Sequence, residues 1–146
     1  MADLKASKPI SGACLCGAVR FEIAPPTQTC GHCHCTMCRR AHGAGYVTWV
    51  ILPSNQLRFV AGEENLTRYP SSDHGARRFC SSCGSTLFGE STRTPDLSYV
   101  VVANLEGEID RVPEFHASYP NRVPWVVVAD DLPKLDDTGV LETREE

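Results

Sequence analysis

The chain has 146 residues, of which 42% are hydrophobic and 22% charged, and its formal net charge is -4. These values are typical of a globular domain and argue against a disordered chain, a nucleic-acid-binding protein or a protein that docks on anionic membranes. No apolar run approaches the ~18 residues that a membrane span requires. We expect a single domain over 11–135, a flexible lead-in at 1–10 and an acidic, disordered tail at 136–146.

Short strands dominate the pattern along the chain. Residues 18–23 alternate apolar and polar side chains, and 46–52 are β-branched and aromatic, so both are predicted strands. The segments 57–60 and 65–69 predict a hairpin around Gly62. With ten prolines and eleven glycines spread between the elements, the pattern predicts an all-β fold with little helix. Further strands are expected at 76–80, 86–89, 97–103 and 125–128, and one short helix at 36–41.

Eight cysteines occur in three closely spaced groups. They read C-x-C at 14–16, C-x2-C-x-C-x2-C at 30–38 and C-x2-C at 80–83. The N-terminal residues lack the apolar stretch of a signal peptide, so we expect a cytoplasmic protein whose thiols stay reduced. Such pairs then predict zinc sites rather than disulfides, because each pair brings two sulfurs to one point.

The two outer cysteine pairs are expected to form a closed, structural zinc site. In each pair a glycine follows the second cysteine, where a zinc knuckle turns sharply and a residue free to take positive φ is useful. Two ligands from each pair fill the four positions of a tetrahedral ion. The predicted ligands are Cys14, Cys16, Cys80 and Cys83.

The middle group supplies the residues of a second zinc site. Three thiolates, Cys33, Cys35 and Cys38, can bind one ion and leave its fourth position for water or a substrate thiol. The cation would lower the pKa of such a thiol and so favour its reactive thiolate form. Arg39 and Arg40 follow at the rim, where they can meet a substrate carboxylate.

Other residues of the middle group leave alternatives open. Cys30 can complete a second four-thiolate site or be a buried spare thiol, and His32 or His34 can be a ligand or a supporting donor. A closed second site would make the protein a non-catalytic zinc-binding interaction module. A third hypothesis is a redox or metal-buffering protein that uses the crowded thiols.

Three stretches of the chain resemble the glutathione-dependent formaldehyde-activating enzyme family, which includes centromere-protein-V-like proteins. They are CLCGAVRFE at 14–22, CHCTMCRR at 33–40 with Gly43, and RFCSSCGSTL at 78–87. The resemblance covers about residues 10 to 128 and implies an all-β, zinc-stapled tent of several small antiparallel sheets. It also implies one structural zinc on the two outer cysteine pairs and one catalytic zinc on the last three cysteines of the middle group. Cys30 is not part of the family pattern.

The activity implied by the resemblance is that of a zinc-dependent carbon–sulfur lyase. S-(hydroxymethyl)glutathione synthase, which joins glutathione to formaldehyde, is the expected type, or an enzyme acting on a related small thiol conjugate. Glutathione would be the co-substrate, and its carboxylates would suit Arg39 and Arg40. Trp49, an aromatic residue of a predicted strand, can either wall the substrate cleft or belong to the core. His116 stands where relatives often carry a histidine, and it can move a proton between thiol, water and the hemithioacetal oxygen. The pattern indicates no oligomeric state.

Overall fold

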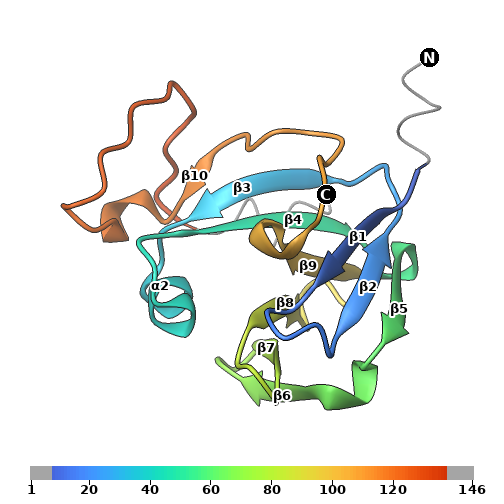
Figure 1. Ribbon diagram of the computed structural model, residues 1–146. Helices are drawn as coiled ribbons and strands as arrows, with labels where there is room; N and C mark the ends of the chain where they lie inside the picture. Colours follow the sequence, from blue (N-terminus) through green and yellow to red (C-terminus); the bar gives the residue numbers. More distant parts are fainter. Residues whose placement is uncertain (1–7, 138–146) are drawn as a thin grey trace.

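The computed structural model of the protein describes residues 8–137, which form two sheets (Figure 1). The smaller sheet has the order β1-β2-β5, with β1 at Ile10–Ala13, β2 at Arg20–Ile23 and β5 at Leu57–Ala61. The larger sheet has the order β10-β3-β4-β9-β8-β7-β6. In that order its strands are His116–Ala117, Thr29–Cys33, Val47–Pro53, Leu97–Val101, Thr86–Ser91, Gly75–Cys80 and Leu66–Pro70. The expected all-β fold is confirmed.

The larger sheet is buried on both faces along its strand β4. Successive side chains of a strand point to opposite faces. Val50 and Leu52 therefore pack into one core cluster, while Trp49 and Ile51 pack into another. The first cluster also contains Cys14, Cys30 and Cys80, and the second contains Cys33 and Cys38. The two predicted metal sites thus lie on opposite faces of one sheet.

The single α-helix in residues 8–137 is α2, Thr36–His42, and it confirms the helix expected at 36–41. Cys35 caps its start, because the Cys35 sulfur accepts a hydrogen bond from the Cys38 amide at 3.3 Å. Gly43 ends it with a φ of 61°, a left-handed conformation that favours glycine. Figure 1 shows α2 below one end of β3 and β4, with β1, β2 and β5 at the other end. Four short 3-10 turns complete the described elements: Ser54–Gln56, Glu63–Asn65, Val102–Asn104 and Tyr119–Asn121.

Two predictions about strands are wrong. The segments 57–60 and 65–69 do not form a hairpin, because β5 pairs with β2 in the small sheet and β6 pairs with β7 in the large one. Gly62 instead carries the chain from one sheet to the other with a φ of 81°, and a Cβ there would meet the Ala18 carbonyl oxygen. Residues 125–128 form no strand, and the apolar side chains that suggested one are exposed, Trp125 at 70% and Val127 at 86%. Strands β1, β3 and β10 were not predicted.

Most of the expected lead-in and acidic tail, residues 1–7 and 138–146, lies outside the described residues. None of the helices within 8–137 has the length and apolar character needed to cross a bilayer.

Candidate metal centres

The first centre lies where β1 of the small sheet and β7 of the large sheet end. Its four sulfur atoms all lie within 4.8 Å of one another. The distance between sulfurs is 3.7 Å from Cys14 to Cys16 and 3.8 Å from Cys16 to Cys80. Four sulfurs held by one tetrahedral zinc at about 2.3 Å lie about 3.8 Å apart. The donor set and its spacing therefore fit a metal ion enclosed by Cys14, Cys16, Cys80 and Cys83.

The two cysteine pairs of this centre fold into turns of the same kind. The amides of Cys14 and Cys80 each donate to the carbonyl five residues later, at 3.1 and 2.9 Å. Gly17 and Gly84 close the turns with φ values of 82 and 81°, and each donates its amide back to the first cysteine's carbonyl. Only glycine takes this backbone conformation without strain, so the glycines after each pair are explained by the turn.

Groups outside the first centre hold its sulfurs in place. The Val19 amide donates to the Cys14 sulfur at 3.3 Å, and the Asn65 side chain donates to the Cys80 sulfur at 3.4 Å. Donors of this kind orient thiolate ligands and offset part of their negative charge. With four sulfurs from the protein, a tetrahedral ion has no position left for a substrate.

The second centre contains three cysteines from one short segment. Cys33 is the last residue of β3, Cys35 caps α2, and Cys38 lies in the first turn of the helix. Their sulfurs lie within 4.8 Å of one another. In residues 8–137, no fourth histidine, cysteine or carboxylate belongs to this group. Three sulfurs leave one position of a tetrahedral ion open, and an open position is what a reactive site requires.

The charges of the second centre fit a cation. Hydrogen bonds from the Cys33 and Cys38 thiols hold the pKa of Cys35 below that of a free cysteine, while the contact with Cys35 raises the pKa of Cys33. Without a nearby cation, the three crowded thiols therefore do not all ionise to thiolates. A metal ion supplies the positive charge that lets all three bind as thiolates.

A cavity of about 230 Å³ opens beside the second centre. Its wall contains the three cysteines and Trp49, whose indole Nε1 donates to the Cys38 sulfur at 3.4 Å. Trp49 is 4% exposed, so the predicted cleft wall is also part of the second core cluster. The cavity is lined further by Ser71, Ser72, His74, Glu90 and Arg93, among others.

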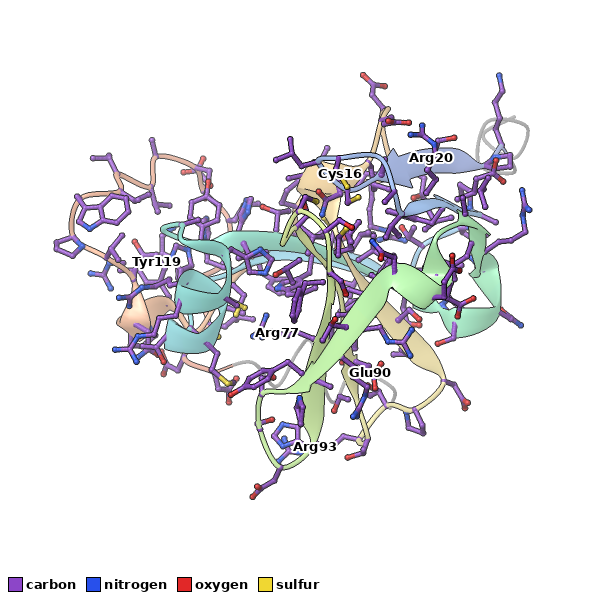
Figure 2. The ribbon with its side chains drawn as sticks, turned by 60° about the horizontal axis from the view of Figure 1, so that its bottom comes forward. Cys16, Arg20, Arg77, Glu90, Arg93 and Tyr119 are labelled. Carbon is purple, nitrogen blue, oxygen red and sulfur yellow. The ribbon has the colours of Figure 1, made fainter. Side chains whose placement is uncertain are left out.

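Arg77 is the cavity residue that the sequence analysis missed. Its guanidinium donates a hydrogen bond from Nη2 to the Cys38 sulfur at 3.6 Å and lies 5.7 Å from the centre of the Trp49 ring. Its Nε and Nη1 are buried and have no hydrogen-bond partner among the described residues. Figure 2 shows Arg77 near the centre of the molecule beside the helix, far from Cys16 of the first centre. Buried guanidinium nitrogens with unused donors indicate a place for an anionic ligand.

Cys30 and the two histidines of the middle group lie apart from the second centre. Cys30 is fully buried in the first core cluster, on the opposite face of β3 from Cys33, so it does not complete the three-cysteine group. His32 Nδ1 lies 2.8 Å from the Thr48 hydroxyl. His34 Nε2 lies 2.8 Å from Nδ1 of His116.

Three predicted functional residues do not line the cavity. Arg39 and Arg40 lie on α2 beyond Cys38, and Arg39 donates to the Asn121 carbonyl at 2.8 Å. His116 lies in β10, where its Nε2 is 3.0 Å from a carboxylate oxygen of Asp130. Their predicted roles remain predictions.

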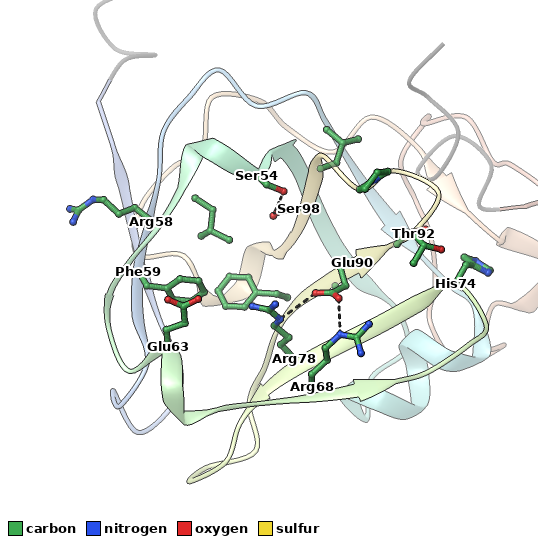
Figure 3. Close-up of a pocket in the computed structure, with 16 residues that line it drawn as sticks. Ser54, Arg58, Phe59, Glu63, Arg68, His74, Arg78, Glu90, Thr92 and Ser98 are labelled. Atoms are coloured by element: carbon green, nitrogen blue, oxygen red, sulfur yellow. Dashed lines mark hydrogen bonds and ion pairs between the residues drawn. The ribbon is translucent and has the colours of Figure 1, made fainter.

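A larger cavity, of about 660 Å³, lies between β5 and the strands β6 to β8 (Figure 3). Glu90 crosses it and pairs with Arg68 at 2.7 Å and with Arg78 at 3.2 Å. These ion pairs offset the positive charge of the arginines in the larger cavity, and no cysteine lines that cavity. The smaller cavity, with its sulfur atoms and the two unpaired guanidinium nitrogens of Arg77, is therefore the better candidate for chemistry.

The chain is similar to known proteins over most of its length. Residues 9–121 match the model of a family described as glutathione-dependent formaldehyde-activating enzyme. A Halomonas elongata protein named provisionally as such an enzyme is 29% identical over 126 residues, which is 82% of this chain and 80% of the relative. A Schizosaccharomyces pombe protein named as an uncharacterized lyase is 34% identical over 79 residues, 53% of this chain and 54% of the relative.

A solved structure has a related fold. The crystal structure of a Rhodobacter sphaeroides protein superimposes with a TM-score of 0.57 at 34% identity, and the match covers 67% of this chain and 89% of that one.

Proposed function

The chain belongs to the glutathione-dependent formaldehyde-activating enzyme family, and we propose that it is a zinc-dependent carbon–sulfur lyase. In this proposal it joins the thiol of glutathione, or of a similar small anionic thiol, to formaldehyde. The three-cysteine centre holds the catalytic zinc ion and the four-cysteine centre holds a structural one. All eight cysteines are free of disulfides, which suits a protein of the reducing cytoplasm.

The observation that carries the proposal is the combination, in one cavity, of an open three-cysteine group and a guanidinium with two buried nitrogens that have no hydrogen-bond partner. Buried charged donors that stay unpaired are unfavourable, so Nε and Nη1 of Arg77 suit a ligand that brings negative charge. The Cys38 sulfur lies 3.6 Å from Arg77 Nη2. A small thiol that also carries a carboxylate can therefore reach the metal centre and the guanidinium together.

The chemistry requires little of the protein beyond binding and positioning. Bound at the three cysteines, zinc supplies a Lewis acid that lowers the pKa of a substrate thiol. Trp49 and Arg77 donate to the Cys38 sulfur and hold the ligand set in place. The substrate sulfur forms a bond to the aldehyde carbon, the electron pair of the carbonyl moves to oxygen, and that oxygen takes up the proton that the thiol lost.

Other residues have supporting roles in this proposal. Arg77 holds one substrate carboxylate, and Arg93, which also lines the cavity, can meet a second. Arg39 and Arg40 remain predicted contacts for a part of the substrate that extends past α2. His116 remains a predicted proton carrier, although it is hydrogen-bonded to His34 and Asp130 and does not line the cavity.

Two variants on neighbouring positions test the binding half of the proposal. β7 places Arg77 in the small cavity and Arg78 in the larger one, so Arg77→Gln and Arg78→Gln change the same charge on opposite faces of one strand. We expect calorimetry to show glutathione binding in the wild type and Arg78→Gln, and binding at least about tenfold weaker in Arg77→Gln. Equal affinities in the two variants would contradict the assigned role of Arg77.

Metal content tests the proposal that each cysteine centre holds one zinc ion. After dialysis against buffer without added zinc, which leaves only the ions held by the cysteine centres, elemental analysis should give two zinc ions in the wild type and one in Cys35→Ser, with loss of glutathione binding in that variant. Two firmly bound zinc ions and no thiol binding in the wild type would instead favour the non-catalytic interaction module. Addition of formaldehyde to glutathione-bound protein, followed by NMR of the adduct, then distinguishes turnover from binding.

A further inference from the structure

We propose that His32, His116 and Asp130 form a third metal site, which binds a divalent transition ion of the zinc class outside both cysteine centres. One ligand atom from each residue lies within 4.8 Å of the other two. Two imidazoles and one carboxylate are a ligand set typical of zinc and its neighbours, whereas calcium and magnesium prefer oxygen ligands alone. The site contains no cysteine and does not depend on the proposed enzyme activity.

The fold brings the three residues together from distant parts of the chain. β10 pairs with β3 in parallel, with His116 opposite His32, and the two imidazole rings lie 4.8 Å apart. Asp130 comes from the segment that returns past β10, where the His116 amide donates to the Pro133 carbonyl at 2.9 Å. The Asp130 carboxylate oxygens lie 3.0 and 3.1 Å from His116 Nε2. The approach of the ligands is therefore fixed by backbone pairing.

The third site is separate from the second centre. Neighbouring residues of a strand point to opposite faces, so His32 and Cys33 project from opposite sides of β3. An ion on one side cannot share ligands with an ion on the other. The two sites are nonetheless joined through adjacent residues of the same strand.

Each proposed ligand is held from its far side, as metal ligands usually are. His32 Nδ1 lies 2.8 Å from the Thr48 hydroxyl, which leaves Nε2 for a metal ion. His116 Nδ1 lies 2.8 Å from His34 Nε2, which leaves Nε2 facing Asp130. One Asp130 oxygen accepts a hydrogen bond from the Leu132 amide at 3.0 Å. The imidazole and carboxylate orientations are thus set before any ion binds.

The site is buried on one side and open on the other. The His116 side chain is 2% exposed, and the rings of Tyr46 and Tyr119 lie 6.3 and 5.8 Å from its own. The Asp130 side chain is 41% exposed, so an ion can enter from solvent and complete its coordination with water. Figure 2 shows Tyr119 on the side of the molecule away from Arg93. Three protein ligands and an open position resemble the composition of reactive zinc sites.

Neighbouring aspartates provide a matched test of the ligand set. Asp130→Asn keeps the shape and a hydrogen-bond acceptor for His116 but removes the charge, whereas Asp131→Asn removes the same charge from an exposed position outside the cluster. We would dialyse tag-free protein, both cysteine centres filled with zinc, against buffered free zinc and measure the metal content. Three ions are expected in the wild type and Asp131→Asn, with the third bound at least about tenfold more weakly in Asp130→Asn.

Several results would overturn the proposal. Two ions in the wild type at micromolar free zinc would do so, as would a third ion that Asp130→Asn leaves unchanged or that Asp131→Asn weakens equally. Nitrogen NMR of the histidine rings gives an independent readout, because binding must shift the Nε2 signals of His32 and His116 together. Thr48→Val, which removes the partner of His32 Nδ1, should weaken only the third ion; an effect on the second centre would contradict the separation of the sites.

Discussion

Replacing Gly84 with alanine tests whether the turn geometry, and not the sulfur atoms alone, determines the strength of the four-cysteine centre. Gly84 has a φ of 81°, and a Cβ built on it meets nothing within 4 Å. The substitution therefore causes no clash, and its cost is that of holding an L-residue in the left-handed region, about 1–2 kcal/mol. At 1.4 kcal/mol per factor of ten, this corresponds to a loss in zinc affinity of about 5- to 30-fold.

Gly107 offers the matched control for this prediction. A Cβ on Gly107 also meets nothing within 4 Å, and its φ lies outside the positive region. Gly107→Ala should therefore change the free energy of unfolding by no more than about 0.5 kcal/mol. Urea unfolding with zinc present, and zinc competition against a chromophoric chelator, measure the two quantities. Equal effects of the two substitutions would refute the reasoning, whereas near-normal affinity in Gly84→Asn would support it, because asparagine tolerates this conformation better.

Three further predictions concern buried and half-buried groups. Burial raises the pKa of the Cys30 thiol to about 12. The stability that this thiol contributes is therefore complete below about pH 8.5 and is lost as the pH rises toward 12. In urea unfolding at alkaline pH, Cys30→Ala should lack this decline, and it should keep the zinc content of the wild type. Burial alone would raise the pKa of Glu114, but hydrogen bonds, the first from Thr29, hold it below its usual value. Its stabilisation is therefore present above about pH 4.3 and disappears as the pH falls through the folded pKa, so Glu114→Gln should lower the unfolding midpoint at pH 7 and not in strong acid. Phe21 is 1% exposed, so Phe21→Ala should lower the free energy of unfolding in urea by about 3–5 kcal/mol, more than Phe59→Ala does at a half-buried position. Similar decreases at the two positions would contradict the assigned core.

Local patterns predicted the parts of the fold that depend on local geometry. The helix at 36–41 and the two cysteine groupings follow from spacing within a few residues, and the structure contains them. Strand pairing was less accessible, because a period of two shows which side chains share a face but not which strand lies alongside. The segment after Gly62 therefore reads as the second half of a hairpin, although it pairs with β7 in the other sheet.

In the candidate sites, too, local spacing predicted the groups that are close in sequence but not the residues that distant strands bring in. Cysteine spacing was sufficient to propose the three-cysteine centre, but Arg77 reaches it from β7, which lies 39 residues from Cys38 along the chain. The sequence contained a signal for it, because the consecutive arginines at 77 and 78 must point to opposite faces of a strand. The cluster of His32 and His116 had no such signal: β10 has only two residues, too few for any periodic pattern.

The two cysteine centres join chain segments of very different separation, so a metal ion at each centre would act differently on the unfolded protein. Cys16 and Cys80 are separated by 64 residues, so the four-sulfur set exists only once both sheets have come together. Cys33, Cys35 and Cys38 are close neighbours even in an extended chain. The nascent polypeptide can therefore take up an ion at the second centre before it folds, and an ion that binds both states adds little to the folding equilibrium. A metal ion at the first centre would bind the folded state alone, so a shortage of zinc would lower the amount of folded protein before it emptied the three-cysteine centre.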